Sequence, residues 1–169
     1  DGHFEKLGTR FVMKSTGQIE TRRESGGLDA LSSAADVLDQ GRALGIFPEG
    51  TRSKRTEAPF LLPGKTGVAR LAASYPECVV VPIALMGTRN MMEAQKHKFP
   101  RLHKQVTIQS GEGITWYQWL TDVNGGNQSA ESLKLLAEKE EHEIRSELAA
   151  IYRRFTDQLM GSILALGAP

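Results

Sequence analysis

The sequence predicts an α/β protein in which helices flank a mixed, mainly parallel sheet and a helical appendage follows at the C-terminal end. Two apolar runs, residues 43–47 and 78–85, have the length and composition of buried strands. A helical pattern over residues 65–73 lies between them, and this order of strand, helix and strand is typical of a parallel βαβ unit. The third observation is a long helical pattern over residues 129–166, which predicts the appendage.

The first predicted helix covers residues 27–40. Its apolar residues recur three and four positions apart, which places them on one helical face; they are Leu28, Leu31, Ala34, Ala35 and Leu38. Gly41 follows as a typical C-cap residue. The next predicted strand, residues 43–47, ends at Pro48, because proline cannot donate to the hydrogen-bond ladder of a sheet. The carboxyl end of this strand therefore opens onto a loop.

The later elements are predicted from the same kinds of pattern. The valine-rich run over residues 78–85 favours a buried strand. Residues 105–110 alternate polar and apolar side chains, which predicts a half-buried strand at the edge of the sheet. The C-terminal helical pattern has a charged middle, residues 138–147, and a more apolar end, residues 151–166. We therefore expect this helix to break once.

Length and glycine content predict the domain organisation. A chain of 169 residues can bury the core of one compact domain and is too short for two ordinary ones. Residues 122–128, which contain Gly125 and Gly126, form the best linker candidate. We therefore predict an α/β domain over residues 1–121, a linker over 122–128 and a helical segment over 129–169.

Composition and charge exclude several classes of protein. The 21 Lys and Arg residues nearly balance the 20 Asp and Glu residues, so the net charge of +1 gives no global attraction for nucleic acid, and we expect no nucleic-acid partner. A single cysteine, Cys78, excludes an internal disulfide, argues against a metal site and fits a reducing compartment. The longest apolar run, residues 78–87, is half as long as the roughly 20 residues that a membrane-spanning helix needs. The first residues also lack the pattern of a signal peptide.

The most informative segment is the loop after the first predicted strand, residues 47–53, with the sequence FPEGTRS. Gly50 permits close approach of the backbone to a ligand, Thr51 supplies a hydroxyl group, and Arg52 can pair bidentately with phosphate oxygens. Its position favours a site, because ligands of open α/β sheets bind beyond the carboxyl ends of the strands. The alternative is an exposed loop whose Glu and Arg form a surface pair of little energetic value.

The FPEGTRS segment resembles the phosphate-recognition block of the glycerol-phosphate and lysophosphatidic acid acyltransferases, which it matches letter for letter. Upstream, residues 17–23 resemble the family block that ends in an arginine, with Arg23 at that position. Downstream, GKTGVARLA at residues 64–72 is similar to the family's helix. VVVPIALMGT at residues 79–88 is similar to the following strand, with Pro82 at the proline of the last motif. The resemblance covers about residues 14–113.

This resemblance implies the fold of the glycerolipid acyltransferases and transfer of a fatty acyl group without a cofactor. The donor is acyl-CoA or acyl carrier protein, and the acceptor is a hydroxyl group of 1-acyl-glycerol 3-phosphate (lysophosphatidic acid) or glycerol 3-phosphate. The product from the first acceptor is phosphatidic acid, a step of phospholipid synthesis. The three functions that stay open are a lysophosphatidic acid acyltransferase, a glycerol-3-phosphate acyltransferase and a non-catalytic lipid- or phosphate-binding module.

The catalytic pair of this family is a histidine followed five residues later by an aspartate. None of the four histidines here has an aspartate at that spacing; they are His3, His97, His103 and His142. We therefore identify no catalytic residue and expect an acyltransferase domain that is incomplete at its N-terminal side. We also expect no turnover by the chain alone.

The resemblance implies a set of residues that hold the phosphate of the acceptor. They are Arg23, Glu49, Gly50, Thr51 and Arg52. Arg52 would pair with phosphate oxygens, whereas Glu49, itself an anion, would orient an arginine or the acceptor. Lys65 and Pro82 are secondary candidates, and Pro82 fits a core position in a strand equally well.

A basic run with interleaved apolar residues precedes a group of aromatic residues. The basic run consists of Lys96, His97, Lys98, Arg101, His103 and Lys104, and the aromatic residues are Trp116, Tyr117 and Trp119. Anionic lipid would suit this composition, because each Lys or Arg near the surface contributes about 1 kcal/mol and tryptophan favours the headgroup level. We accordingly expect a peripheral protein on the cytoplasmic face of a membrane. The alternatives are docking of an acidic carrier protein, or a solvated loop beside tryptophans that fill the core.

Overall fold

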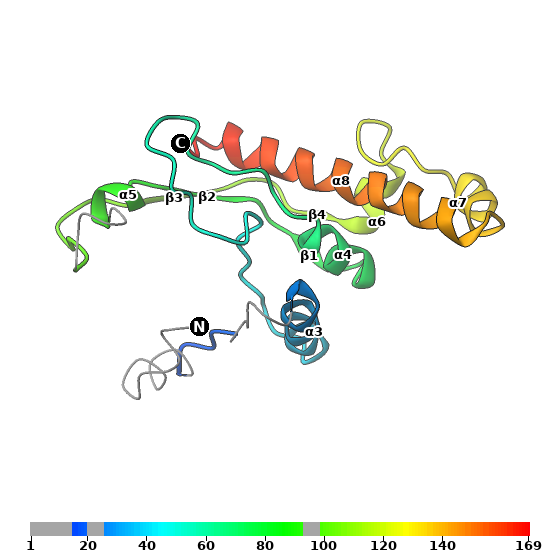
Figure 1. Cartoon of the computed structure of the whole chain (residues 1–169), viewed down its shortest axis with the longest axis horizontal. Coiled ribbons are helices and arrows are strands. Elements are labelled where there is room, and N and C mark those ends of the chain that lie inside the picture. The colour runs from blue at the N-terminus through cyan, green and yellow to red at the C-terminus, as the bar shows by residue number, and fades with distance from the viewer. Residues whose placement is uncertain (1–14, 20–25, 93–98) are drawn as a thin grey trace. The chain divides into compact units, whose positions relative to one another are not determined.

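The chain divides into two compact units, Asp1–Ile46 and Phe47–Pro169. The computed structural model describes residues 15–19, 26–92 and 99–169 (Figure 1). Five residues of interest from the sequence lie outside these ranges: His3, Arg23, Lys96, His97 and Lys98. The predicted division into an α/β domain over residues 1–121, a linker over 122–128 and a helical segment over 129–169 stays a prediction.

The first unit contains helix α3 (Gly26–Asp39), which confirms the helix predicted over residues 27–40. Ala34, on the predicted apolar face, is buried. Gly41 ends the helix with a φ of 67°, and its N–H donates to the carbonyl of Leu38 at 2.9 Å. The predicted C-cap is therefore confirmed, because this left-handed conformation is readily adopted only by glycine.

The prediction of a strand over residues 43–47 is wrong. These residues form no ladder in the described part of the chain, and Phe47 is 71% exposed. Apolar composition favours a strand only where a neighbouring strand is available to pair with it. The boundary between the two units falls within this run, between Ile46 and Phe47.

The second unit contains two short sheets. Strand β1 (Val79–Val80) pairs with β4 (Ile114–Thr115), and β2 (Ile83–Met86) pairs with β3 (Thr107–Ser110). Both pairs are antiparallel, and the described residues contain no parallel pair, so the mainly parallel sheet predicted from the βαβ pattern is not what they form. The physical reason is that the chain after β2 returns alongside it, whereas residues 43–47 supply no parallel neighbour.

Pro82 divides the single strand predicted over residues 78–85 into β1 and β2. Proline has no N–H for the ladder, but its carbonyl still accepts a hydrogen bond from the N–H of Gly111 at 2.9 Å. The ring of Pro82 is buried.

Strand β3, which pairs with β2, is exposed along its whole length, and Ile108 within it is 68% exposed. The strand predicted over residues 105–110 is therefore present as β3, but the prediction that it is half-buried is wrong.

The main core of the second unit is aromatic and lies between three helices, α4 (Gly67–Ser74), α6 (Trp116–Thr121) and α8 (Glu141–Ala165). It contains Ala69, Ala72, Trp116, Trp119 and Phe155. The rings of Trp119 and Phe155 meet edge to face with centroids 4.9 Å apart, a favourable aromatic geometry. Both tryptophans are thus core residues and are not available to a lipid surface.

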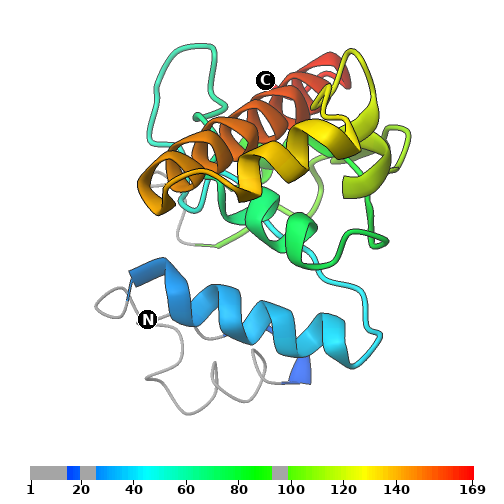
Figure 2. The same ribbon diagram turned by 90° about the vertical axis from the view of Figure 1, so that its right-hand side faces the viewer.

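Helices α7 (Ala130–Ala137) and α8 form the C-terminal segment (Figure 2). The predicted single break in residues 129–166 is therefore confirmed. Lys139, in the break, pairs with Glu147 of α8, which raises the pKa of Lys139 above its ordinary value, chiefly through their hydrogen bond. The far end of α8 packs on β2 through Ala84, Met160 and Ile163. None of the helices in the described ranges is both long and apolar enough to cross a membrane.

Candidate functional site

The described site residues fall into two groups. Residues 47–53 and Lys65 lie together, because the backbone N–H of Lys65 donates to the carbonyl of Pro48 at 2.7 Å. Pro82 is instead a buried residue between β1 and β2, where it contacts the segment around Gly111. Arg23 lies outside the described residues. The structure therefore brings Lys65 to the FPEGTRS loop and places Pro82 in the sheet.

The loop begins with a tight turn that only glycine completes without strain. The N–H of Gly50 donates to the carbonyl of Phe47 at 3.0 Å, which closes the turn over Pro48 and Glu49. Gly50 has a φ of 67°, in the left-handed region that disfavours residues with a Cβ atom. This turn exposes the backbone of Gly50 and the side chains of Thr51 and Arg52 to solvent.

Lys65 lies directly against Gly50. A Cβ atom added at Gly50 would lie 3.0 Å from Cδ and 3.1 Å from both Cε and Nζ of Lys65. The end of this lysine side chain, including its ammonium group, therefore passes over the backbone of the turn. Lys65 itself remains exposed, so the ammonium group is accessible to a ligand from solvent.

The side chain of Glu49 forms a hydrogen bond within the protein. Its Oε2 atom accepts a hydrogen bond from the backbone N–H of Leu62 at 2.7 Å, in a partly buried setting. This bond fastens the start of the loop to its return. The carboxylate of Glu49 therefore binds a backbone amide of the protein.

Two arginines that the sequence analysis did not assign to the site shape the return of the loop. Nη1 of Arg55 donates to the carbonyls of Pro59 at 2.8 Å and of Leu61 at 3.2 Å. Arg89 donates to the carbonyl of Arg55 at 2.9 Å and stacks over the ring of Phe60, 4.1 Å from its centroid. Arg89 belongs to the short helix α5 (Thr88–Met91). No local pattern in the sequence could have indicated this contact, because the two arginines are 34 positions apart.

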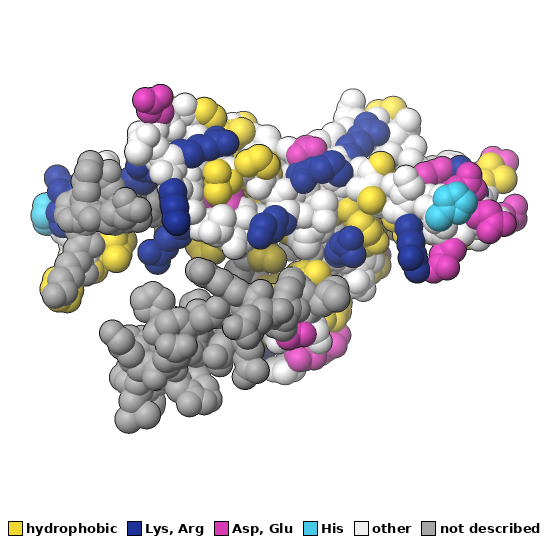
Figure 3. Space-filling model, in the orientation of Figure 1, with side chains coloured by type: hydrophobic (Ala, Val, Ile, Leu, Met, Phe, Trp, Pro, Cys, Tyr) yellow, Lys and Arg dark blue, Asp and Glu magenta, His cyan; other side chains and the backbone are white. Residues whose placement is uncertain are grey.

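The electrostatic character of the site is positive. Within the described ranges no acidic side chain forms an ion pair with Arg52 or Lys65. Figure 3 shows Lys and Arg side chains spread along one face of the second unit, whereas Asp and Glu gather where α7 meets α8. The small net charge of the chain thus conceals a separation of charge within this unit.

This arrangement suits recognition of an anion. It combines an exposed glycine backbone, a hydroxyl group, a guanidinium group and an ammonium group, all of which favour phosphate oxygens. The histidines that the structure describes, His103 and His142, are exposed residues of the 101–104 loop and of the first turn of α8. In the part of the chain described, no cluster of His, Cys, Asp and Glu side chains has the geometry of a metal site.

Comparison with known proteins shows a similarity to one family. The family model described as Acyltransferase matches residues 3–86, a range that includes the whole candidate loop as well as Lys65 and Pro82. Over these residues the chain is similar to the Acyltransferase family, and its relatives include two 1-acyl-sn-glycerol-3-phosphate acyltransferases. No solved structure matches it significantly.

The chain is also similar in sequence to three curated proteins. It is 30% identical over 118 residues to a 1-acyl-sn-glycerol-3-phosphate acyltransferase of Helicobacter pylori, covering 66% of this chain and 48% of the relative. It is 38% identical over 71 residues to a chloroplastic 1-acyl-sn-glycerol-3-phosphate acyltransferase of Arabidopsis thaliana, covering 38% of this chain and 17% of the relative. It is 34% identical over 94 residues to a protein named Taffazin of Dictyostelium discoideum, covering 51% of this chain and 31% of the relative. The chain thus spans less than half the length of each.

Proposed function

We propose that the chain forms the acceptor-binding part of an acyltransferase that moves a fatty acyl group onto 1-acyl-glycerol 3-phosphate. The donor is acyl-CoA or acyl carrier protein, and the product is phosphatidic acid for phospholipid synthesis. The names of the Helicobacter pylori and Arabidopsis thaliana relatives support this reaction, and the family match covers the loop proposed to bind the phosphate.

The observation that carries the proposal is the position of Lys65 over the backbone of Gly50. A phosphate at this turn would meet the ammonium group of Lys65 and the backbone amides of Thr51 and Arg52, because the N–H of Gly50 already donates to the carbonyl of Phe47. Arg52 follows two positions after Gly50 and offers a planar fork of donors that fits two phosphate oxygens. The two cationic side chains would together compensate the charge of the phosphate.

Glu49 contributes by holding the loop. Because its carboxylate accepts the N–H of Leu62, its negative charge is partly neutralised by a donor in the protein. The phosphate is therefore bound by the cations and the backbone of the turn, and Thr51 adds a hydroxyl donor. Arg23 is proposed as a further phosphate ligand on the basis of the family pattern alone, and Pro82 as part of the wall of the site.

The proposed acceptor requires access to a lipid surface. We place the protein peripherally on the cytoplasmic face of a membrane, where lysophosphatidic acid is presented. Exposed basic residues of the described part of the 96–104 run, His103 and Lys104, are available to anionic lipid. Trp116 and Trp119 take no part, because both are buried.

The reaction is tested with the gene product that contains these 169 residues. Acyl transfer from acyl-CoA to 1-acyl-glycerol 3-phosphate is measured for the unsubstituted protein and for Arg52→Ala. We expect the substitution to lower kcat/KM by about tenfold or more, the effect of losing a hydrogen bond between charged groups. Arg145→Ala is the matched control, because Arg145 is an exposed arginine on α8 that pairs only with Glu141 among the described residues. Undiminished transfer by Arg52→Ala would contradict the phosphate assignment.

Glycerol 3-phosphate is the alternative acceptor, because it presents the same phosphate to the same loop. Parallel assays with both acceptors separate the two enzymes by the ratio of their kcat/KM values. If the gene product binds glycerol 3-phosphate or lysophosphatidic acid and transfers no acyl group, the result would instead support a non-catalytic phosphate-binding module.

A further inference from the structure

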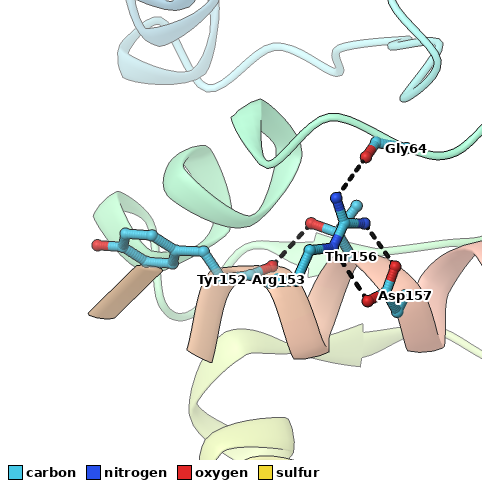
Figure 4. Close-up of polar contacts among 5 residues, drawn as sticks. All are labelled: Gly64, Tyr152, Arg153, Thr156 and Asp157. Carbon is cyan, nitrogen blue, oxygen red and sulfur yellow. Dashed lines mark hydrogen bonds and ion pairs between the residues drawn. The ribbon is translucent and has the colours of Figure 1, made fainter. Parts of the chain in front are cut away.

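One peptide group connects the C-terminal helix α8 to the candidate phosphate loop. It is the peptide that joins Gly64 to Lys65. Its N–H donates to the carbonyl of Pro48 at 2.7 Å, and its carbonyl accepts a hydrogen bond from Nη1 of Arg153 at 2.8 Å (Figure 4). The same peptide thus contacts the loop through one atom and α8 through another.

The guanidinium group of Arg153 is held in a single orientation. Its Nε and Nη2 atoms donate to the two carboxylate oxygens of Asp157, at 3.0 and 2.6 Å, one helical turn further along α8. A bidentate pair of this kind fixes the plane of the guanidinium group. Its remaining terminal nitrogen is therefore aimed at the carbonyl of Gly64, as Figure 4 shows.

Close packing brings that carbonyl within reach of Arg153. Gly64 is buried against α8, and a Cβ atom added to it would lie only 2.8 Å from both Cγ of Met160 and Cγ2 of Thr156. Thr156 is fully buried and its hydroxyl group donates to the carbonyl of Tyr152 at 2.8 Å, so its methyl group has little freedom to move away. The absence of a side chain at residue 64 is what allows the peptide to approach the helix.

We propose that Arg153 is a positioning residue for acceptor binding, which acts through the Gly64–Lys65 peptide on the loop and on the Lys65 side chain. This inference rests on the proposed function of the loop. A cation bonded to a peptide carbonyl polarises that peptide and strengthens donation by its N–H. Arg153 therefore tightens the bond from Lys65 to Pro48 and holds Lys65 over Gly50. It does not touch the phosphate itself.

The coupling is tested by hydrogen exchange in the whole 169-residue chain. We expect Arg153→Met, which keeps most of the aliphatic stem and removes the donor, to raise the exchange rate of the Lys65 amide by about tenfold, as loss of a charged hydrogen bond predicts. Arg153→Lys retains a positive charge but not the planar fork that pairs with Asp157, so it should restore only part of the protection. Arg145→Met is the matched control on the same helix, because it removes the ion pair with Glu141 and leaves Gly64 untouched.

Binding of glycerol 3-phosphate to the same four proteins provides the second readout. We expect the dissociation constant to rise about tenfold for Arg153→Met, to recover in part in Arg153→Lys, and to change little for Arg145→Met. Faster exchange at Lys65 with unchanged affinity would overturn the positioning role. Unchanged exchange would overturn the coupling itself. Absence of glycerol 3-phosphate binding by the unsubstituted chain would contradict the proposed function, while the exchange rates would still decide the coupling.

Discussion

The carboxylate of Glu49 accepts a hydrogen bond from the backbone N–H of Leu62 at 2.7 Å and so joins the two ends of the candidate phosphate loop. Arg55 stabilises the segment between Glu49 and Leu62 by donating hydrogen bonds to the carbonyls of Pro59 and Leu61. Glu49 can therefore occupy a loop proposed to bind phosphate, because its carboxylate binds a backbone N–H group and stabilises the loop.

Two substitutions of Glu49 distinguish the effect of its hydrogen bond on stability from the effect of its charge. Glu49→Ala leaves the partly buried N–H of Leu62 unpaired, and we expect the free energy of unfolding to fall by about 1–3 kcal/mol. Glu49→Gln keeps a carbonyl oxygen that can accept the same hydrogen bond, so we expect a fall of less than about 1 kcal/mol. Urea unfolding followed by circular dichroism measures both. Equal losses in the two variants would show that the negative charge, and not the hydrogen bond, fastens the loop.

Gly50→Ala is expected to affect both stability and binding. The left-handed φ of 67° costs about 1 kcal/mol for alanine, and the new Cβ atom displaces the Lys65 side chain that lies 3.0 Å away. We therefore expect weaker binding of glycerol 3-phosphate together with a lower free energy of unfolding. Isothermal titration calorimetry and urea unfolding check the two effects.

Gly41→Ala is the matched control for that experiment. Gly41 has the same φ of 67°, but a Cβ atom there would meet no other atom within 4 Å. This control should lose a similar amount of stability, about 1 kcal/mol, and keep its affinity for glycerol 3-phosphate. If both variants lost affinity equally, the contact of Lys65 with Gly50 would not contribute to the site.

Gly64→Ala tests the packing of the loop's return on α8. Its methyl group would lie 2.8 Å from side-chain atoms of Met160 and Thr156, closer than atoms pack without displacement. We expect a loss of about 1–3 kcal/mol in the free energy of unfolding, as is usual when a close-packed contact is overfilled. An unaltered midpoint of chemical unfolding would mean that Gly64 does not press against the helix.

Gly161→Ala should change stability in the opposite direction. Gly161 lies in the interior of α8, where a Cβ atom would meet nothing within 4 Å, and glycine there carries an entropic cost. We expect the free energy of unfolding to rise by about 0.5–1 kcal/mol, measured as a higher thermal midpoint. Destabilisation would contradict the open surface found at this position.

Much of the local structure could be predicted from the sequence. Helix α3 and its cap at Gly41 follow from the spacing of apolar residues and one glycine, both of which act within a few residues. The loop after Pro48 was also predicted, but its turn at Gly50, closed by a hydrogen bond to Phe47, was not specified. A single break in the C-terminal helical pattern was also expected, but it falls between α7 and α8 at the start of the charged section, and α8 continues through the change from charged to apolar composition at residues 147–151.

The strand pairing and the supporting contacts of the site depended on distant parts of the chain. The partner of β2 comes from residues 107–110, and no periodicity within β2 distinguishes an antiparallel from a parallel neighbour. Arg153 reaches Gly64 across 89 positions, so nothing in the motif around Lys65 could have indicated it. Residues 43–47 failed as a strand because apolar composition alone supplies no hydrogen-bonding partner.

The central claim, that the turn at Gly50 with Arg52 and Lys65 binds the phosphate of a glycerol phosphate, is tested most directly by nuclear magnetic resonance. Glycerol 3-phosphate is titrated into the ¹⁵N-labelled 169-residue chain, with glycerol as the control that lacks the phosphate. We predict the largest shift changes at the amides of Gly50, Thr51, Arg52 and Lys65, saturating with glycerol 3-phosphate, absent with glycerol, and with affinity reduced about tenfold in Arg52→Ala. Shift changes confined to residues away from this loop, or equal changes with glycerol, would contradict the account.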